Sequence, residues 1–120
     1  MRNSRLFNEF RRIMLAFGYS LAGLKAAWGE CAFRLEIIFT IIALPSTFII
    51  TNVAAERALL IGSLFLVLIV ELLNTAIEAA INRISLEIHP LSKKAKDVAS
   101  AAVFLSIVNA IMIWSAVLWN

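Results

Sequence analysis

The chain has 120 residues, 62% of them hydrophobic, and a mean hydropathy of +0.89. Soluble domains are about 45–50% apolar, so this composition is typical of a membrane protein with a single domain, residues 1–120. The lone cysteine, Cys31, excludes an internal disulfide, and the lone histidine excludes a zinc site of Cys and His ligands. We expect no cleaved signal peptide, because the basic N-terminal segment lacks an apolar run followed by a small-residue cleavage site.

Residues 5–29 predict an amphipathic helix at the membrane surface. Apolar side chains recur every three or four residues from Leu6 to Trp28, and most basic side chains lie off this stripe. Such a helix lies in the membrane interface. It is either a simple surface anchor or one wall of a cleft through which a lipid reaches the site.

Three apolar segments follow, at 35–55, 58–82 and 98–119, each long enough to cross about 30 Å of hydrocarbon. Pro45 lies within the first, where bilayer helices tolerate proline. Residues 83–97 form a polar cytoplasmic connection, in which Ser92 is the expected N-cap of the third span. The predicted fold class is an all-α membrane protein with an N-terminal amphipathic surface helix plus three transmembrane helices.

Positive charge is distributed unevenly around these segments. The formal net charge is +3, and ten of the eleven basic residues precede the first span or lie between the second and third. Only Arg57 lies between the first two spans. The positive-inside rule therefore predicts a cytoplasmic N-terminus and an external C-terminus. Nucleic acid is not an expected partner, because the lysines belong to membrane boundaries.

Two carboxylates interrupt the second apolar segment. Glu71 and Glu78 are almost two helical turns apart, so they share one helix face with Asn74 between them, about 10 Å apart along the axis. A carboxylate in hydrocarbon costs at least about 2.5 kcal/mol, so it is rarely without function. One interpretation is polar contact between packed helices or an ion pair with Arg34. The other is a site for magnesium and phosphate, because hard cations take oxygen ligands.

Depth separates the roles of these acids. Glu78 lies nearer the cytoplasmic end and is the better metal ligand, whereas Glu71 lies deeper, where poor hydration suits it to general-base catalysis. Glu30 precedes the first span, four residues before Arg34. It either forms a helical ion pair with Arg34 or supplies a second carboxylate for the metal.

The segment from His89 to Asp97 contains three lysines at the start of a helix, Lys93, Lys94 and Lys96. The helix dipole disfavours cations at this end, and a bound anion would relieve the conflict. Alone, ordinary positive-inside charge explains the cluster equally well. Beside an acidic metal site, the cluster favours nucleotide phosphate. Because no phosphate-loop or kinase glycine motif is present, phosphoryl transfer requires a different scaffold.

Four separated stretches resemble the small bacterial integral-membrane diacylglycerol kinases. They are VELLNTAIEAAINRI (70–84), HPLSKKAKDVASAAV (89–103), GYSLAGLKAAW (18–28) and the stretch from Glu30 to Glu36. The resemblance extends from about residue 12 to residue 119. It implies a homotrimer of three-span subunits in the bacterial cytoplasmic (inner) membrane that phosphorylates diacylglycerol with magnesium-ATP to give phosphatidic acid. Because three helices cannot enclose both a lipid headgroup and ATP, we expect sites completed between subunits.

The resemblance also implies a role for individual positions. Glu71 is the implied catalytic base with Asn74 supporting it, and Glu30 and Glu78 are the implied Mg²⁺ ligands. The implied ATP contacts are Arg12, Tyr19, Glu30, Glu78, Glu87, Ile88, His89, Lys96 and Asp97. The implied lipid contacts are Arg12, Ser20, Lys25, Trp28, Arg34, Glu36, Glu71, Ser100 and Trp114.

The chain departs from the family pattern at a few positions. Leu21 stands where a tryptophan is familiar, Asn82 replaces an acid, Pro90 replaces a glutamate, and one residue is missing before Glu30. A sister branch phosphorylates undecaprenol, which is the alternative acceptor. A small proton-coupled transporter, with Glu71 as the carrier, is an alternative from another class, but it needs neither the lysines nor a second carboxylate. A purely structural membrane protein leaves both buried carboxylates unexplained.

Overall fold

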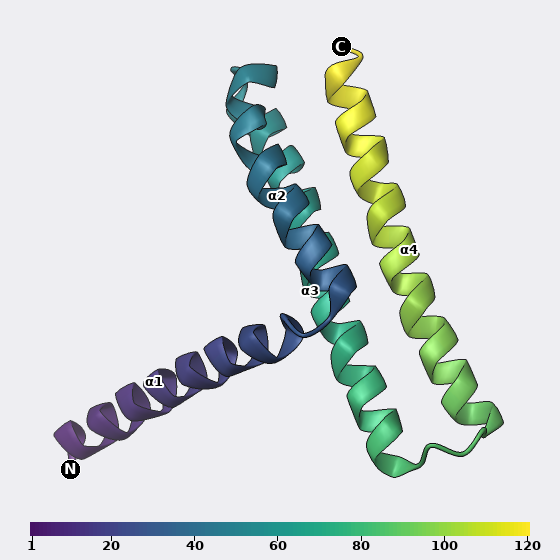
Figure 1. Ribbon diagram of the computed structural model, residues 1–120. Coiled ribbons are helices and arrows are strands. Elements are labelled where there is room, and N and C mark those ends of the chain that lie inside the picture. Colours follow the sequence, from purple (N-terminus) through teal and green to yellow (C-terminus); the bar gives the residue numbers. More distant parts are fainter.

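The computed structural model describes residues 1–120 and contains four α-helices and no strand (Figure 1). The helices are α1 (Arg2–Ala27), α2 (Cys31–Ile50), α3 (Ala54–Ile84) and α4 (Pro90–Leu118). The last three are long and apolar enough to cross a membrane. The predicted all-α class with three candidate spans is confirmed, and the chain is a multi-pass membrane protein.

Helix α1 leaves the bundle formed by the other three helices (Figure 1). Every residue of α1 except Ala27 is exposed, and only the C-terminal end of the helix meets α3, so most of its apolar stripe has no protein partner. The molecule is therefore flat, with extents of 51 × 51 × 21 Å. An apolar stripe without a protein partner fits a helix that lies in the membrane interface.

Helix α3 is the centre of the bundle, because both α2 and α4 pack along it. α4 runs antiparallel to α3: Asn82 contacts Lys96 next to the connection, and the Trp114 indole donates a 3.2 Å hydrogen bond to Ser63 Oγ towards the other end. The buried residues of α4 are the small Ala99 and Ser106. Small residues let membrane helices approach closely, which accounts for the long α3–α4 contact.

The helices differ in length, and this places the acidic residues. α3 has 31 residues and α2 has 20, a difference of roughly 16 Å at about 1.5 Å per residue. Both helices meet at the turn 51–53, so α3 extends beyond the start of α2 at the opposite end (Figure 1). Leu68 packs against Phe33 in the core cluster. Glu71 therefore lies level with the first turn of α2, and Glu78 lies beyond it.

The connection between α3 and α4 is shorter than predicted. Helix α4 begins at Pro90, so only residues 85–89 lie outside a helix, whereas the predicted cap at Ser92 would start the helix at Lys93. The N-cap is His89, whose Nδ1 accepts a 3.1 Å hydrogen bond from the Leu91 N–H. The predicted cap, Ser92, is wrong, because Pro90 at the first helical position already starts the helix two residues earlier.

The turn between α2 and α3 is closed by polar contacts within the chain. The Thr51 hydroxyl donates a 2.5 Å hydrogen bond to Glu56 Oε2, and Arg57 donates a 2.8 Å hydrogen bond to the Thr51 carbonyl. The Arg57 guanidinium also lies 4.4 Å from the centre of the Phe48 ring. These contacts hold the start of α3 against the end of α2.

Candidate active site

Four carboxylates from α2 and α3 gather at the level where α2 begins. Glu71 is buried, with 6% of its surface exposed. It lies within electrostatic reach of Glu78 and Glu30, and Glu36 lies within electrostatic reach of Glu71. The only ion pair in the structure is that of Lys93 and Asp97, so none of the four is paired with a cation. Of the four, only Glu71 is buried, and a buried charge in a protein is normally paired, bound to a metal or neutralised by a proton, so Glu71 is open to a cation or proton from outside the chain.

The alternative interpretations that involved Arg34 find no support in the structure. Arg34 is exposed and forms no ion pair with Glu30 or Glu71. Glu30 is the N-cap residue of α2, but its side chain accepts no backbone hydrogen bond there. It lines a cavity of about 680 Å³ together with residues of α1 and with Thr75 and Ala79 of α3. The Glu30 carboxylate is therefore available to a ligand.

Asn74 lies between the two glutamates of α3, as its sequence position predicts. Its Nδ2 donates a long hydrogen bond of 3.4 Å to Glu78 Oε1. Its Oδ1 is buried and has no hydrogen-bond partner. An unpartnered buried amide oxygen is unusual in a folded protein and is an acceptor for a donor or cation that the chain lacks.

The oxygen ligands near Glu78 suit magnesium better than they suit a metal that is bound by protein ligands alone. No group of three or more His, Cys, Asp or Glu side chains is arranged to hold a metal ion. Mg²⁺ usually keeps several waters and takes only one or two carboxylates together with substrate phosphates. The carboxylates of Glu30 and Glu78, with the amide oxygen of Asn74 next to Glu78, fit that pattern.

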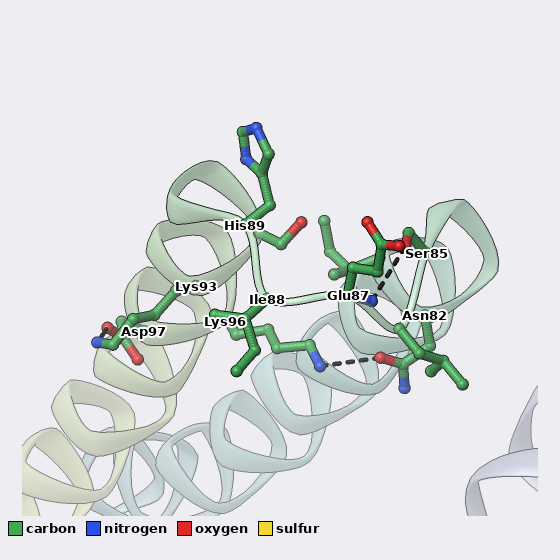
Figure 2. Close-up of a pocket in the computed structure, with 11 residues that line it drawn as sticks. Asn82, Ser85, Glu87, Ile88, His89, Lys93, Lys96 and Asp97 are labelled. Atoms are coloured by element: carbon green, nitrogen blue, oxygen red, sulfur yellow. Dashed lines mark hydrogen bonds and ion pairs between the residues drawn. The ribbon is translucent and has the colours of Figure 1, made fainter.

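A second candidate region lies where α3 and α4 meet (Figure 2). A cavity of about 400 Å³ is lined by the last turn of α3, the connection 85–89 and the first two turns of α4. It brings together five of the predicted nucleotide contacts: Glu87, Ile88, His89, Lys96 and Asp97.

Hydrogen bonds organise the polar groups of this α3–α4 cavity. The Glu87 N–H donates to Ser85 Oγ at 3.0 Å, which shapes the connection and leaves the Glu87 carboxylate exposed. Lys93 Nζ forms a 2.5 Å ion pair with Asp97, and Lys96 Nζ donates a 2.8 Å hydrogen bond to Asn82 Oδ1. The His89 ring points away from the Lys96 ammonium (Figure 2).

Other predicted site residues are not brought together within one chain. Arg12 lies in a shallow groove on α1, and Tyr19 is exposed on the same helix, away from the α3–α4 cavity. Among the predicted lipid contacts, Glu36 lines an apolar cavity of about 440 Å³ between α2, α3 and α4. Of the remaining predicted lipid contacts, Ser20 of α1 lines the same cavity as Glu30. The others are spread over the molecule: Lys25 of α1, Trp28 just after α1, Arg34 of α2, and Ser100 and Trp114 of α4.

Comparison with known proteins places the chain in a family. A family model described as prokaryotic diacylglycerol kinase matches residues 18–118. The chain belongs to this family. The diacylglycerol kinase of Pseudomonas aeruginosa is 49% identical over 109 residues, which cover 90% of this chain and 89% of that protein. Those of Escherichia coli K12 and Haemophilus influenzae are 47% and 42% identical, over 92% and 84% of this chain and 92% and 86% of those proteins.

Family membership confirms the predicted resemblance and the predicted enzyme class, a kinase. A kinase uses a nucleotide substrate. Together with the three helices that can cross a membrane, family membership makes the chain a multi-pass membrane kinase. This result excludes the transporter and the purely structural protein as explanations of Glu71 and Glu78.

Asn82 and Ser85 contribute to the α3–α4 cavity, although neither was among the predicted site residues. Their signal in the sequence was their place at the end of a long helix, Asn82 in its last turn and Ser85 directly after it, opposite the lysines across a short connection. That signal was hidden because residues 83–97 were expected to be one long polar connection.

Proposed function

We propose that the chain transfers the γ-phosphoryl group of Mg-ATP to the free hydroxyl of diacylglycerol, giving phosphatidic acid and ADP. The observation that carries this proposal is the buried, unpaired Glu71 at the level where α2 begins, with the α3–α4 cavity further along the same helix. The names of the relatives support diacylglycerol as the acceptor.

The proposed chemistry is an in-line displacement. Glu71 takes the proton of the lipid hydroxyl as its oxygen forms a bond to the γ-phosphorus. The bond from that phosphorus to the bridging oxygen breaks, and ADP leaves with the electron pair. Asn74, held next to Glu78 by its 3.4 Å hydrogen bond, keeps the face of α3 in register with the reacting groups. Positioning and charge stabilisation supply most of the catalysis in phosphoryl transfer.

Glu30 and Glu78 are the residues that would hold Mg²⁺. Both carboxylates are free of ion pairs, and the unpartnered Asn74 Oδ1 lies next to Glu78. When bound, the metal neutralises negative charge on the phosphate oxygens. Glu30 approaches from the junction of α1 and α2, whereas Glu78 belongs to α3, so the two ligands also bring these elements together.

The nucleotide is proposed to occupy the α3–α4 cavity. Glu87, Ile88, His89, Lys96 and Asp97 line it, and Lys96 supplies an ammonium for phosphate. Arg12 and Tyr19 lie on α1 and do not reach this cavity within one chain. We therefore propose a homotrimer, in which α1 of one subunit completes the site of another.

The lipid is proposed to reach Glu71 from within the membrane. Glu36 lies at one end of the apolar cavity of about 440 Å³ that also contains Leu64 and Ile111. The remaining proposed lipid contacts line other faces of the helices and the surface helix: Arg12, Ser20, Lys25, Trp28, Arg34, Ser100 and Trp114.

A kinase assay with a panel of lipids tests the proposal. Purified protein in mixed micelles receives radiolabelled ATP and either diacylglycerol, undecaprenol or no lipid acceptor, with Glu71→Gln as the matched inactive control. We expect label in phosphatidic acid. Preferential labelling of undecaprenol would replace the acceptor and keep the chemistry, and absence of lipid labelling would reject the proposal.

The proposed orientation places the N-terminus in the cytoplasm and the C-terminus outside. Its support is the uneven distribution of basic residues around the three spans. Single cysteines at Ser92 and Asn120, in a background without Cys31, are treated with a membrane-impermeant reagent. We expect Asn120 to be labelled from outside and Ser92 only after permeabilisation. Labelling of both from the same side would contradict three crossings.

A further inference from the structure

Lys96 is the lysine in the α3–α4 cavity whose charge no acid neutralises. The cavity contains two lysines, Lys93 and Lys96. Lys93 is ion-paired to Asp97 at 2.5 Å. Lys96 forms no ion pair, and its ammonium bonds instead to the neutral amide of Asn82 at 2.8 Å. The cavity therefore keeps one full positive charge available to an anion.

The contact between Asn82 and Lys96 joins two helices. Asn82 lies in the last turn of α3, and Lys96 lies in the second turn of α4, fourteen residues later. Figure 2 shows the Lys96 side chain reaching across to Asn82, while the pair of Lys93 and Asp97 lies on the other side, away from Asn82. The Lys96 ammonium is thus directed by a residue of the opposite helix.

The chemistry of the amide suits this task. A lysine side chain is long and flexible, so fixing it in one conformation costs rotamer freedom, which a hydrogen bond offsets. The amide oxygen of Asn82 accepts one of the three ammonium N–H groups and leaves two for a ligand. The family pattern has an acid at this position, which would fix the same geometry but pair with the ammonium. The amide of this chain leaves the full charge to a ligand, and an apolar residue would keep the charge but lose the direction.

We infer that Asn82 is a positioning residue, which holds the Lys96 ammonium in the cavity for a nucleotide phosphate without neutralising it. This inference rests on the proposed nucleotide site and adds to it a residue of the cavity wall that acts on the nucleotide through Lys96. The contact between Asn82 and Lys96 therefore contributes to ATP affinity as well as to the packing of α3 against α4.

The experiment compares Asn82→Asp, Asn82→Ala, Lys96→Ala and the double variant Asn82→Ala/Lys96→Ala in mixed micelles at saturating lipid. We expect Asn82→Asp to raise the apparent KM for ATP about fivefold and Asn82→Ala about threefold, with kcat changed less than about twofold, because the two residues act as a coupled pair. In the double variant, loss of Asn82 should add nothing to loss of Lys96. Lys94→Ala, on the same helix turn but outside the cavity, is the matched control.

The outcomes separate this inference from the proposed function. If Asn82→Ala raises KM by the same factor with and without Lys96, Asn82 acts independently of the lysine and the inference is wrong. If Asn82→Asp, which preserves side-chain size, leaves KM unchanged, the inference is also wrong. If Lys96→Ala itself leaves the KM for ATP unchanged, the assignment of this cavity to the nucleotide fails, and the inference fails with it. Thermal unfolding of each variant identifies any change due to misfolding.

Discussion

The two ends of the helical bundle treat their polar residues in opposite ways. At the end formed by the α2–α3 turn, Thr51, Glu56 and Arg57 bind one another, and Arg57 also stacks on Phe48. At the other end, Glu71 is buried without an ion pair, and Lys96 has only a neutral partner. Both ends contain charge in or near an apolar environment. The first end satisfies its charges with contacts from within the chain, whereas the second pairs Lys93 with Asp97 but leaves Glu71 and Lys96 without a charged partner.

This difference indicates which polar groups maintain the fold and which are kept for a ligand. A buried polar group without a partner costs free energy, so a chain that retains several in one place has another use for them. The end with Glu71 collects the unpartnered Asn74 and Glu36 oxygens as well. The exception at the other end is Arg57 Nε, which is also unpartnered, although the same guanidinium is otherwise held.

The sharpest test of the comparison is Glu71→Gln against Glu56→Gln. The first removes the proposed base and keeps side-chain volume, so kcat should fall at least about 10²-fold, the low end for loss of a general base. The fold should survive, because an amide is easier to bury than a carboxylate. Glu56→Gln should leave kcat unchanged. Turnover and thermal unfolding of both proteins check this, and a well-folded Glu71→Gln enzyme with normal turnover would remove Glu71 from the mechanism.

The next effect concerns the cavity lysine. Lys96→Ala should raise the apparent KM for ATP at least about tenfold, because a hydrogen bond to a charged phosphate is lost. Lys94→Ala removes the same charge from an exposed position outside the cavity and should change KM little. Initial rates over a range of ATP concentrations distinguish them. Equal effects from both lysines would show that general positive charge, and not the cavity, attracts the nucleotide.

A smaller effect is expected for the proposed metal ligand. Glu78→Gln removes one ligand charge, so the magnesium concentration needed for half-maximal activity should rise roughly fivefold, since ligand charge tunes the affinity of such sites. Activity should recover at high magnesium. A magnesium titration at fixed ATP measures this, with Glu56→Gln as the control. Unchanged magnesium dependence would exclude Glu78 as a ligand.

The smallest effect on activity should come from the turn at the other end. Arg57→Gln loses the contact with Phe48 and the charged hydrogen bond to Thr51, so the protein should lose about 1–2 kcal/mol of stability. Turnover per folded molecule should stay the same. Asn52→Ala, in the same turn but exposed, is the control. A loss of turnover in Arg57→Gln without a loss of stability would contradict the division between the two ends.

The fold class could be predicted well from the sequence because it depends on patterns that extend over many residues. Apolar runs long enough to span a bilayer and one three-to-four residue stripe were sufficient for four helices. The start of α4 was missed because the capping residue is His89, a side chain outside the usual set of caps. Helix ends depend on single hydrogen bonds, which periodicity does not report.

The candidate site was predictable in part for a related reason. Glu71, Asn74 and Glu78 share one helix, so their spacing alone placed them on one face. The contact between Asn82 and Lys96 joins two helices across a connection whose length the sequence did not define. The same holds for Glu36, which approaches Glu71 only because α2 packs on α3 at that height. Contacts between helices required the structure.

The unequal lengths of α2 and α3 have a consequence for how this enzyme meets its lipid. The 20 residues of α2 span about 30 Å, close to the hydrocarbon thickness of a bilayer. Glu71, level with the first turn of α2, is thereby fixed at the depth of the lipid headgroups. In the proposed mechanism, the acceptor hydroxyl reaches Glu71 by lateral diffusion and never has to leave the membrane. The rate then follows the mole fraction of lipid in the bilayer, and a thinner or thicker bilayer moves the headgroups away from the carboxylate by a few ångströms.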